Sequence, residues 1–304
     1  MIIPAHTEER WTSLVTAVGL IQRQTTPPRQ IVVAVDHNPS LLRRVQAEIP
    51  SIEATANRYD NGASGTRNSG AELAVTPLLA FLDSDVRPRR DWLETLIAPF
   101  ADPAVIGTGG FVAPDWINGR PAWFPAEFLW VVGATFQAAD TPLTTVRNVW
   151  SENMAVRHQA FSRVGGFRID FGKVGDRSSP EDTDFCLRVG HAYPGQKWVL
   201  VVDAVVDHTV GPERSTVAFF LRRCYSEGSS KVTMARLNSG ARELGDEYSY
   251  LRRLVTTSTW TYLRLAVSGR SQAAGGRVLA VLGGLIAATL GAAVAFVTGF
   301  RPGR

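Results

Sequence analysis

The chain has 304 residues, of which 45% are hydrophobic and 20% charged, with a net charge of +4. This is the composition of a folded protein, and the length allows one large α/β domain with an appendage or two modest domains. The basic residues are scattered rather than clustered in a stripe, so nucleic-acid binding is not expected. Cys186 and Cys224 are the only cysteines. Two are too few for a disulfide framework or a zinc site, which fits a reducing compartment.

The first 110 residues alternate strand and helix patterns. Short apolar runs predict strands at 2–3, 30–35, 52–56 and 78–82. Helical spacing of apolar residues predicts helices at 8–24, 41–49 and 66–74, with a glycine-rich loop at 61–65 before the last of them. This alternation is typical of a doubly wound nucleotide-binding fold, in which ligands bind at the carboxyl ends of the strands.

The pattern changes after residue 108. Residues 111–150 are rich in aromatic side chains, which favours core or interfacial packing over a binding platform. Further on, strands are predicted at 154–156, 198–202 and 205–206, and helices at 159–164, 182–189 and 215–235.

Two carboxylates follow the apolar strand 78–82 directly, in the sequence Asp83-Ser84-Asp85. Carboxylates one residue apart at a strand end can share a hard cation such as Mg²⁺ or Mn²⁺, which in turn holds a diphosphate. An acidic turn that caps the strand is the simpler alternative, because Asp and Ser are ordinary turn residues.

The segment 278–300 contains no charged residue and is long enough, as a helix, to cross a bilayer. A transmembrane helix is therefore predicted, with a buried core helix as the alternative. The arginines before it favour a single-pass protein at the cell membrane whose globular part faces the cytoplasm. Gly284, Ala288 and Ala292 form a row of small residues suited to packing against another helix.

Several pieces of the first 230 residues, taken in order, resemble the family 2 glycosyltransferases. They are the opening strand and turn (residues 3–9), the second strand with Asp36, the loop and helix at 62–68, the Asp83-Ser-Asp85 motif, Asn153-Met-Ala, Gly165-Gly-Phe and Pro180-Glu-Asp182. The resemblance is greatest to enzymes of lipid-linked or cell-envelope glycan synthesis. It implies a GT-A fold, a Rossmann-like mixed α/β sheet flanked by helices, to which the chain adds a C-terminal transmembrane helix.

The resemblance also implies an activity: inverting transfer from a nucleotide sugar, expected to be UDP-linked, assisted by Mn²⁺ or Mg²⁺. Asp182 takes the place of the general base, and the alternative for it is a helix cap. The expected metal ligands are Asp85, Asp83 and His208, although a lone histidine is more often structural. Residues expected to bind the donor are Pro4, Ala5, His6, Glu8, Asp36, Arg67, Asp83 and Ser84.

Four further residues are expected near the acceptor: Glu181, Asn153, Trp150 and Arg222. Simpler roles stay open for several positions, such as a turn for Asp36 and a solvated helix face for Arg67 and Arg222. His6 stands where many relatives have tyrosine, which weakens the expectation of uridine. Processive synthases of the family carry Gln-x-x-Arg-Trp, which this sequence lacks, so transfer of a single sugar is expected.

The expected division of the chain has four parts: 1–110 holds the donor, 111–240 the acceptor, 241–277 is a basic interfacial helical segment, and 278–300 spans the membrane. The expected partners are the nucleotide sugar, a lipid-linked or glycan acceptor and the membrane, with a homodimer or a membrane partner protein left open.

Two alternative functions remain, a sugar nucleotidyltransferase and an inactive relative that serves as a nucleotide- or sugar-binding scaffold. The former usually opens with a Gly-rich basic loop that residues 4–8 do not resemble.

Overall fold

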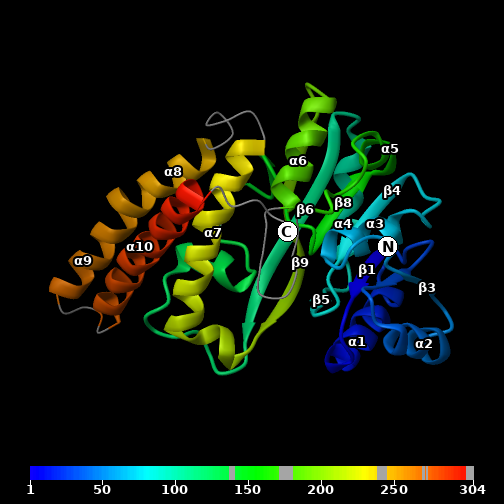
Figure 1. Ribbon diagram of the computed structural model, residues 1–304, viewed down its shortest axis with the longest axis horizontal. Helices are drawn as coiled ribbons and strands as arrows, with labels where there is room; N and C mark the ends of the chain where they lie inside the picture. The colour runs from blue at the N-terminus through cyan, green and yellow to red at the C-terminus, as the bar shows by residue number, and fades with distance from the viewer. Residues whose placement is uncertain (137–140, 171–180, 238–244, 269–270, 272, 299–304) are drawn as a thin grey trace. The chain divides into compact units, whose positions relative to one another are not determined.

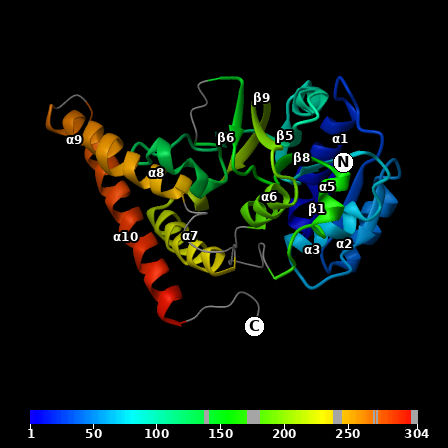
Figure 2. The same ribbon diagram turned by 90° about the horizontal axis from the view of Figure 1, so that it is seen from above.

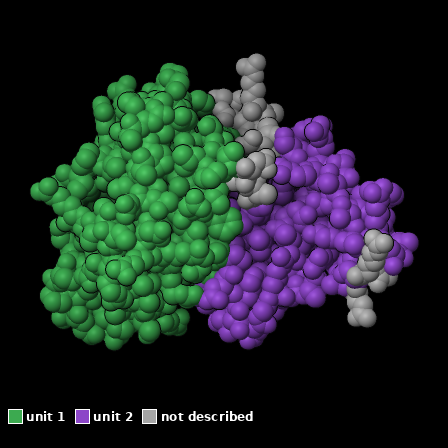
Figure 3. All heavy atoms as spheres, turned by 180° about the vertical axis from the view of Figure 1, so that it is seen from behind, with its two compact units in different colours: residues 1–113, 138–208 green, residues 114–137, 209–304 purple. Residues whose placement is uncertain are grey.

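The computed structural model describes residues 1–136, 141–170, 181–237, 245–268, 271 and 273–298 (Figure 1). The chain forms two compact units (Figure 3). The first unit comprises residues 1–113 and 138–208, and the second comprises 114–137 and 209–304. These units describe packing, so the four-part functional division stays a prediction.

The described strands form one sheet of mixed direction. Its order is β3-β2-β1-β4-β8-β6-β9-β5, and β7 pairs with β9. Their bounds are β1 Ile2–Ala5, β2 Val32–Val35, β3 Glu53–Ala56, β4 Leu78–Leu82, β5 Val86–Pro88, β6 Val105–Trp116, β7 Leu143–Val146, β8 Asn153–Arg157 and β9 Lys197–Val210. The first four strands are parallel, and β8 then runs antiparallel to β4. The carboxyl end of β4 therefore lies beside the start of β8.

Helices cover both faces of this sheet in the first unit (Figures 1 and 2). Their bounds are α1 Trp11–Gln22, α2 Pro39–Glu48, α3 Ala63–Ala71, α4 Trp92–Ile97, α5 His158–Arg163 and α6 Glu181–Ala192. Helices α1, α2 and α4 share one core with Val33 and Leu82. Helices α3, α5 and α6 share the other core with Ile2 and Phe81. Burial on both faces explains why the central strands are continuously apolar.

Local sequence signals explain where these elements begin. The side chain of Asn38 accepts a hydrogen bond from the Leu41 N–H and caps α2, which has Pro39 in its first turn. Helix α3 begins at Ala63, three residues before the predicted start, because Gly62 turns the chain with a φ of 143°. Only glycine adopts such a φ readily.

The prediction is wrong in detail for the second half of the sheet. The two strands expected at 198–202 and 205–206 are one strand, β9, and His208 lies within it rather than after it. Strands β5, β6 and β7 were not predicted. Gly107, Gly109 and Gly110 interrupt the apolar pattern of β6, so the sequence did not predict this strand. A Cβ at Gly107 would lie 2.1 Å from the Trp198 ring, so this strand needs glycine for close packing rather than for a turn.

The second unit is helical. It contains α7 Val217–Leu237, α8 Gly245–Arg253, a π-helical stretch Leu254–Ser258, α9 Thr259–Val267 and α10 Ala274–Thr298. Aromatic residues of the 111–150 region, among them Phe124 and Phe128, pack against Phe220 of α7. For these residues the expected packing role is confirmed.

Helix α10 corresponds to the predicted apolar segment 278–300, but it begins four residues earlier, at Ala274. Its length and a mean hydropathy of 2.3 make it a candidate membrane span. Its small residues pack closely on α7: a Cβ at Gly228 would lie 1.9 Å from the Ala288 carbonyl oxygen, and one at Gly291 would lie 2.0 Å from that of Tyr225. Of the predicted row, Gly284 and Ala288 thus contact α7, and Gly291, which the row did not include, contacts it as well.

Candidate active site

Polar side chains gather where β1, β2 and β4 end and β8 begins. Asp36 follows β2, and its N–H donates to the carbonyl of Ala5 at the end of β1 (2.8 Å). Asp83 follows β4, and its N–H donates to the carbonyl of Glu152, just before β8 (3.3 Å). This edge is where α/β sheets bind ligands.

Asp36 is held rigidly at this edge. Its Oδ1 accepts hydrogen bonds from Asn57 Nδ2 (2.7 Å) and His37 Nδ1 (2.9 Å), and its Oδ2 accepts one from the Gly62 N–H (3.0 Å). The carboxylate therefore joins the second strand to the start of α3. It is a fixed acceptor beside the glycine-rich loop at 61–65.

Arg67 connects two of the predicted site segments. Buried in α3, it donates to Asp83 Oδ1 at 2.7 Å and pairs with Glu181 Oε1 at 3.5 Å. Burial lowers the pKa of Arg67, but the attraction of Asp83, Glu181 and Asp182 outweighs it and the pKa is raised. Arg67 is thus an internal positive charge that balances carboxylates from two different elements, not a solvated residue on a helix surface.

Asp85 pairs with a different arginine. Its Oδ2 lies 2.7 Å from Arg10 Nη1 and 3.9 Å from His208 Nε2. His208 comes close because Val86 of β5 stands opposite it in the register with β9. The structure thus brings together the predicted metal-site residues Asp85 and His208.

The donor set fits a divalent cation, although no group of three or more acidic, histidine or cysteine side chains in the described ranges is arranged as a finished metal site. Ligands at adjacent positions around an ion, each about 2.1 Å away from it, lie about 3 Å apart. Asp85 Oδ2 and His208 Nε2, which are 3.9 Å apart, are near that separation. Asp85 and His208 would hold the cation, with Asp83 two residues before Asp85 in the chain.

Asp182 stands in the first turn of α6 and is half-buried, with its Oδ1 shielded from solvent. It accepts hydrogen bonds from the hydroxyl and the N–H of Ser151, while its Oδ1 has no partner among the described residues. Burial raises the pKa of Asp182, and the attraction of Arg67 and the bonds from Ser151 offset only part of this. One buried oxygen of this carboxylate therefore has no partner in the part of the chain that the structure describes.

Glu152 and Glu181 complete an acidic group. Burial, together with the charges of Asp83, Asp85 and Asp182, raises the pKa of Glu152 well above its usual value. Burial and the neighbouring Asp182 raise the pKa of Glu181 to about 8, with Arg67 opposing them. The carboxyl groups of Asp83, Asp85, Glu152, Glu181 and Asp182 thus gather around Arg10 and Arg67, an excess of acidic groups that suits a cation.

The other predicted residues have varied surroundings. Pro4 and Ala5 lie in β1, the side chain of His6 is exposed, Glu8 lies 3.7 Å from Arg44, and Ser84 is buried. The Oδ1 of Asn153 accepts from Trp92 Nε1 (2.8 Å), and its Nδ2 donates to the carbonyls of Phe111 and Ala204, so its side chain joins strands.

Trp150 packs against the core that includes α1. Arg222 belongs to the second unit, where it stacks on Phe219. Pro180 lies outside the described residues.

Sequence reasoning missed Arg10, Asn57, Ser151 and Glu152. Arg10 and Glu152 belonged to no motif, and only the fold brings them to Asp83 and Asp85. Glu152 had one available signal, because it directly precedes Asn153 of a recognised motif.

A parallel half-sheet with carboxylates at its carboxyl edge, continued by antiparallel strands, is the architecture of the GT-A glycosyltransferases. Solved structures support this class. A mannosyltransferase from Pyrobaculum calidifontis, in complex with GDP-Man and Mn²⁺, aligns over 98% of this chain and 78% of its own (TM-score 0.56, 18% identity). GalNAc-T7 with UDP, GalNAc and Mn²⁺ aligns over 83% of this chain and 53% of its own (TM-score 0.53, 15% identity).

The family model of glycosyl transferase family 2 matches residues 1–165, and the chain belongs to that family. The glucosyl-dolichyl phosphate glucuronosyltransferase of Haloferax volcanii is 29% identical over 260 residues, which are 84% of this chain and 82% of that protein. The pre-mycofactocin glycosyltransferase of Mycobacterium tuberculosis is 31% identical over 162 residues, which are 52% of this chain and 32% of that protein. The chain is therefore a glycosyltransferase, and the predicted family and fold are confirmed.

Proposed function

We propose that this enzyme transfers one sugar, with inversion, from a nucleotide sugar to a hydroxyl of a lipid-linked or cell-envelope glycan. A UDP-linked donor is the first choice. The observation that carries the proposal is Asp182, whose buried Oδ1 has no partner among the described residues, in the same acidic group as Asp83 and Asp85.

Asp182 is the general base of this proposal. The acceptor oxygen bonds to the anomeric carbon as the bond from that carbon to the diphosphate breaks, and Asp182 takes the proton of the acceptor hydroxyl. Its raised pKa suits this task, because a base works best when its pKa approaches the operating pH. Ser151 holds the carboxylate in place through two hydrogen bonds. This geometry favours the base over a simple helix cap.

Donor binding is assigned to the edge formed by Asp36, Asp83 and Asp85. Asp36 accepts a hydrogen bond from the nucleobase of the donor. The oxygen and imidazole ligands of Asp85 and His208, with Asp83 close by, suit Mn²⁺ or Mg²⁺. Such a cation, when bound, neutralises the charge that gathers on the leaving diphosphate. The Mn²⁺ in the two structural neighbours supports this assignment.

The proposal of a lipid-linked acceptor is supported by a relative and by the second unit. The Haloferax relative is named for a dolichyl phosphate substrate. The long apolar helix α10 and the arginines near it would keep the enzyme beside a lipid carrier. We place the enzyme at the cell membrane with its first unit in the cytoplasm. The two alternatives, a sugar nucleotidyltransferase and an inactive scaffold, lose support, since the family match is to glycosyltransferases and the chain carries Asp83, Asp85 and Asp182.

The deciding experiment measures thermal stabilisation of the purified protein by UDP, GDP, dTDP and CMP, each with and without Mn²⁺. At a hundredfold excess over Kd, binding adds about 2.7 kcal/mol to the free energy of unfolding. We expect a manganese-dependent rise in Tm with one nucleotide, and loss of that manganese dependence in Asp85→Ala. No rise with any nucleotide would contradict the proposed donor site. An unchanged manganese dependence in the variant would contradict the metal assignment alone.

A further inference from the structure

One face of α10 is lined by large apolar side chains that are exposed. These are Leu279, Leu282, Ile286, Leu290, Val294 and Val297. They recur every three or four residues and so form a single stripe along the helix. The opposite face, which includes Gly284 and Gly291, is buried. A continuous exposed stripe of this length, unlike scattered apolar residues, marks an interaction surface.

The helical segment before α10 shows the same chemistry with positive charge added. In the stretch 248–267 the exposed large apolar residues are Tyr248, Leu251, Val255, Trp260, Leu263 and Val267. Arg252, Arg253 and Arg264 are exposed among them, and Arg264 stacks on Trp260 at 5.2 Å. Exposed apolar residues, a tryptophan and arginines on one helix are typical of a segment that lies in a membrane interface.

The charged side chains of the C-terminal region are all positive. Residues 248–304 contain no Asp, Glu or Lys, and their arginines are at 252, 253, 264, 270, 277, 301 and 304. The net charge of the full chain is only +4, so acidic residues outnumber basic ones in the rest of it. An apolar surface beside a purely positive segment is complementary to anionic phospholipids.

Helix α7 packs along α10, and unlike α10 it carries charged residues. Phe220 packs on Gly284, Tyr225 on Gly291, and Arg236 donates to the carbonyls of Ala295 and Phe296 (3.2 and 2.7 Å). The two helices therefore run side by side in the same direction, as Figures 1 and 2 also show.

The polar character of α7 persists along this contact. It carries the Glu227–Lys231 ion pair (3.2 Å) between its contacts with Gly291 and Ala295. If α10 crossed a bilayer, α7 and these charges would be drawn to the depth of the hydrocarbon, where ionised side chains are costly.

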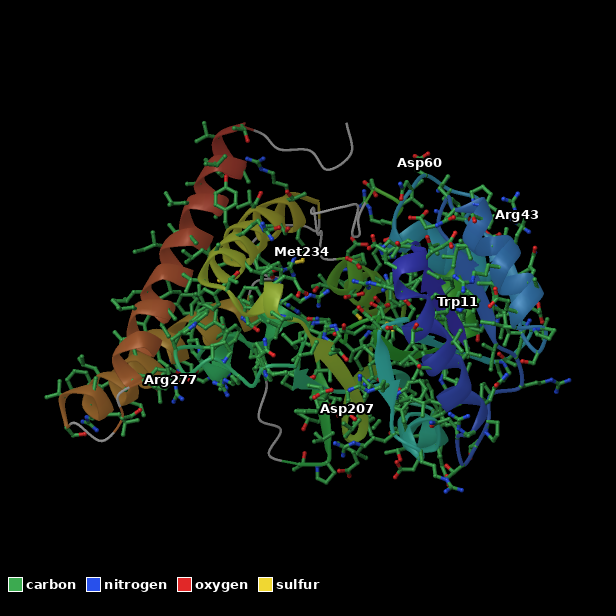
Figure 4. All side chains as sticks on the ribbon, turned by 90° about the horizontal axis from the view of Figure 1, so that it is seen from below. Trp11, Arg43, Asp60, Asp207, Met234 and Arg277 are labelled. Carbon is green, nitrogen blue, oxygen red and sulfur yellow. The ribbon has the colours of Figure 1, made fainter. Side chains whose placement is uncertain are left out.

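We propose that α10 lies in the plane of an anionic phospholipid membrane instead of crossing it. Its exposed stripe and the exposed apolar residues of 248–267 face the lipid, and α7 lies behind α10 on the protein side. Arg277, labelled in Figure 4 near the start of α10, is stacked on Tyr262 and donates to the Ala122 carbonyl, which fixes that end of the helix to the second unit. This inference does not depend on the sugar or the nucleotide used.

The two ends of α10 test the topology. Gly275 and Thr298 are exposed at its start and its end, and no atom lies within 4 Å of a Cβ built at Gly275. Gly275→Cys and Thr298→Cys proteins are treated with a membrane-impermeant maleimide in sealed inside-out membrane vesicles, before and after permeabilisation. The unmodified protein gives the background, because Cys186 and Cys224 are buried. We expect both ends to react equally before permeabilisation, whereas a reaction at one end only after permeabilisation would overturn the in-plane arrangement.

Binding to lipid vesicles tests the surface itself. Phosphatidylglycerol vesicles should bind the purified protein more tightly than phosphatidylcholine vesicles, and added salt should weaken that binding. The double variant Leu282→Glu/Ile286→Glu should lower the partition coefficient at least about tenfold. Val75→Glu is the matched control, since Val75 is an exposed apolar residue of the first unit, and it should change nothing. Equal binding by the double variant, or no preference for anionic lipid, would overturn the proposal.

Discussion

Glu181 and Asp182 are adjacent at the start of α6 but have different partners. Glu181 faces the buried Arg67, while Asp182 accepts hydrogen bonds from Ser151 and keeps one oxygen without a described partner. The first arrangement places a carboxyl group beside a buried guanidinium, and the second leaves one oxygen open to a proton. Two neighbouring carboxylates therefore suit two different tasks, as in other sites where the environment separates acid and base.

For Asp182→Asn we expect the turnover number to fall by about 10²–10⁴-fold, because the amide cannot accept the acceptor's proton. Donor affinity should stay within a factor of about two, since the change removes no donor contact. Steady-state kinetics and nucleotide titration measure the two effects separately. Ordinary turnover in this variant would remove Asp182 from the mechanism.

Glu181 predicts a pH dependence of stability. Its pKa is raised from 4.5 to about 8 in the folded protein, so folding favours the protonated form. Its contribution is therefore complete below about pH 4.5 and is lost as the pH rises through about 8. Glu181→Gln, which stays neutral, should raise Tm at pH 8 relative to the unmodified protein and change it little at pH 4.5.

The experiment is a set of melting curves with and without the substitution across this pH range. If the glutamine variant melts lower than the unmodified protein at pH 8, the attraction of Arg67 outweighs the effect of burial. The pKa of Glu181 would then be lowered by folding rather than raised.

Single residues also show how far sequence reasoning reaches. Asp36, Asp83 and Asp85 were found because they end apolar strands, a pattern that is local in the chain. Arg10 and Glu152 were not found, because their roles arise only when the sheet brings distant segments together. His208 was found next to a strand, but its approach to Asp85 depends on the register of β5 with β9.

At the scale of elements, close contacts decide where glycine is needed. Most glycines of α10 and α7 look interchangeable in the sequence, yet a Cβ at Gly228 would collide with the Ala288 carbonyl, whereas one at Gly275 meets nothing within 4 Å. In a helix interior Gly→Ala normally stabilises by about 1 kcal/mol. The structure predicts opposite outcomes for the same substitution at these two positions.

Gly228→Ala should lower the free energy of unfolding of the second unit by about 1–3 kcal/mol, the usual cost of overpacking. Gly275→Ala should leave it unchanged or raise it by up to about 1 kcal/mol. Denaturant titration followed by tryptophan fluorescence compares the two. A neutral Gly228→Ala would mean that α7 and α10 separate easily.

The strands were harder to predict than the helices for a related reason. Periodicity located α1, α2, α6 and α7 to within a few residues, because each buries one face. Strand β6 escaped notice because Gly107, Gly109 and Gly110 interrupt its apolar pattern, and the side chains that fill the space belong to Val149, Asn153 and Trp198. Such compensation between distant segments is invisible in a local window.

At the scale of the whole molecule, the two units divide the chemistry. The first unit, matched over much of its length by the family model, carries the acidic group, Arg10, Arg67 and His208. The second carries α7 to α10 and the one-sided positive charge. Hydropathy predicted the apolar helix α10. It could not predict that α10 packs against α7, because that contact forms only when the chain folds.

The glycine contacts between α7 and α10 have a practical consequence for anyone who wishes to produce this enzyme in soluble form. Membrane anchors are commonly deleted for that purpose, but ending this chain before Ala274 would uncover Phe128, Phe220 and the surface of α7 around Gly228. The shortened protein should aggregate. Replacing Leu282, Ile286 and Leu290 with polar residues should succeed where deletion fails, because it leaves the inner face of α10 in place and size-exclusion chromatography should then give a monodisperse protein.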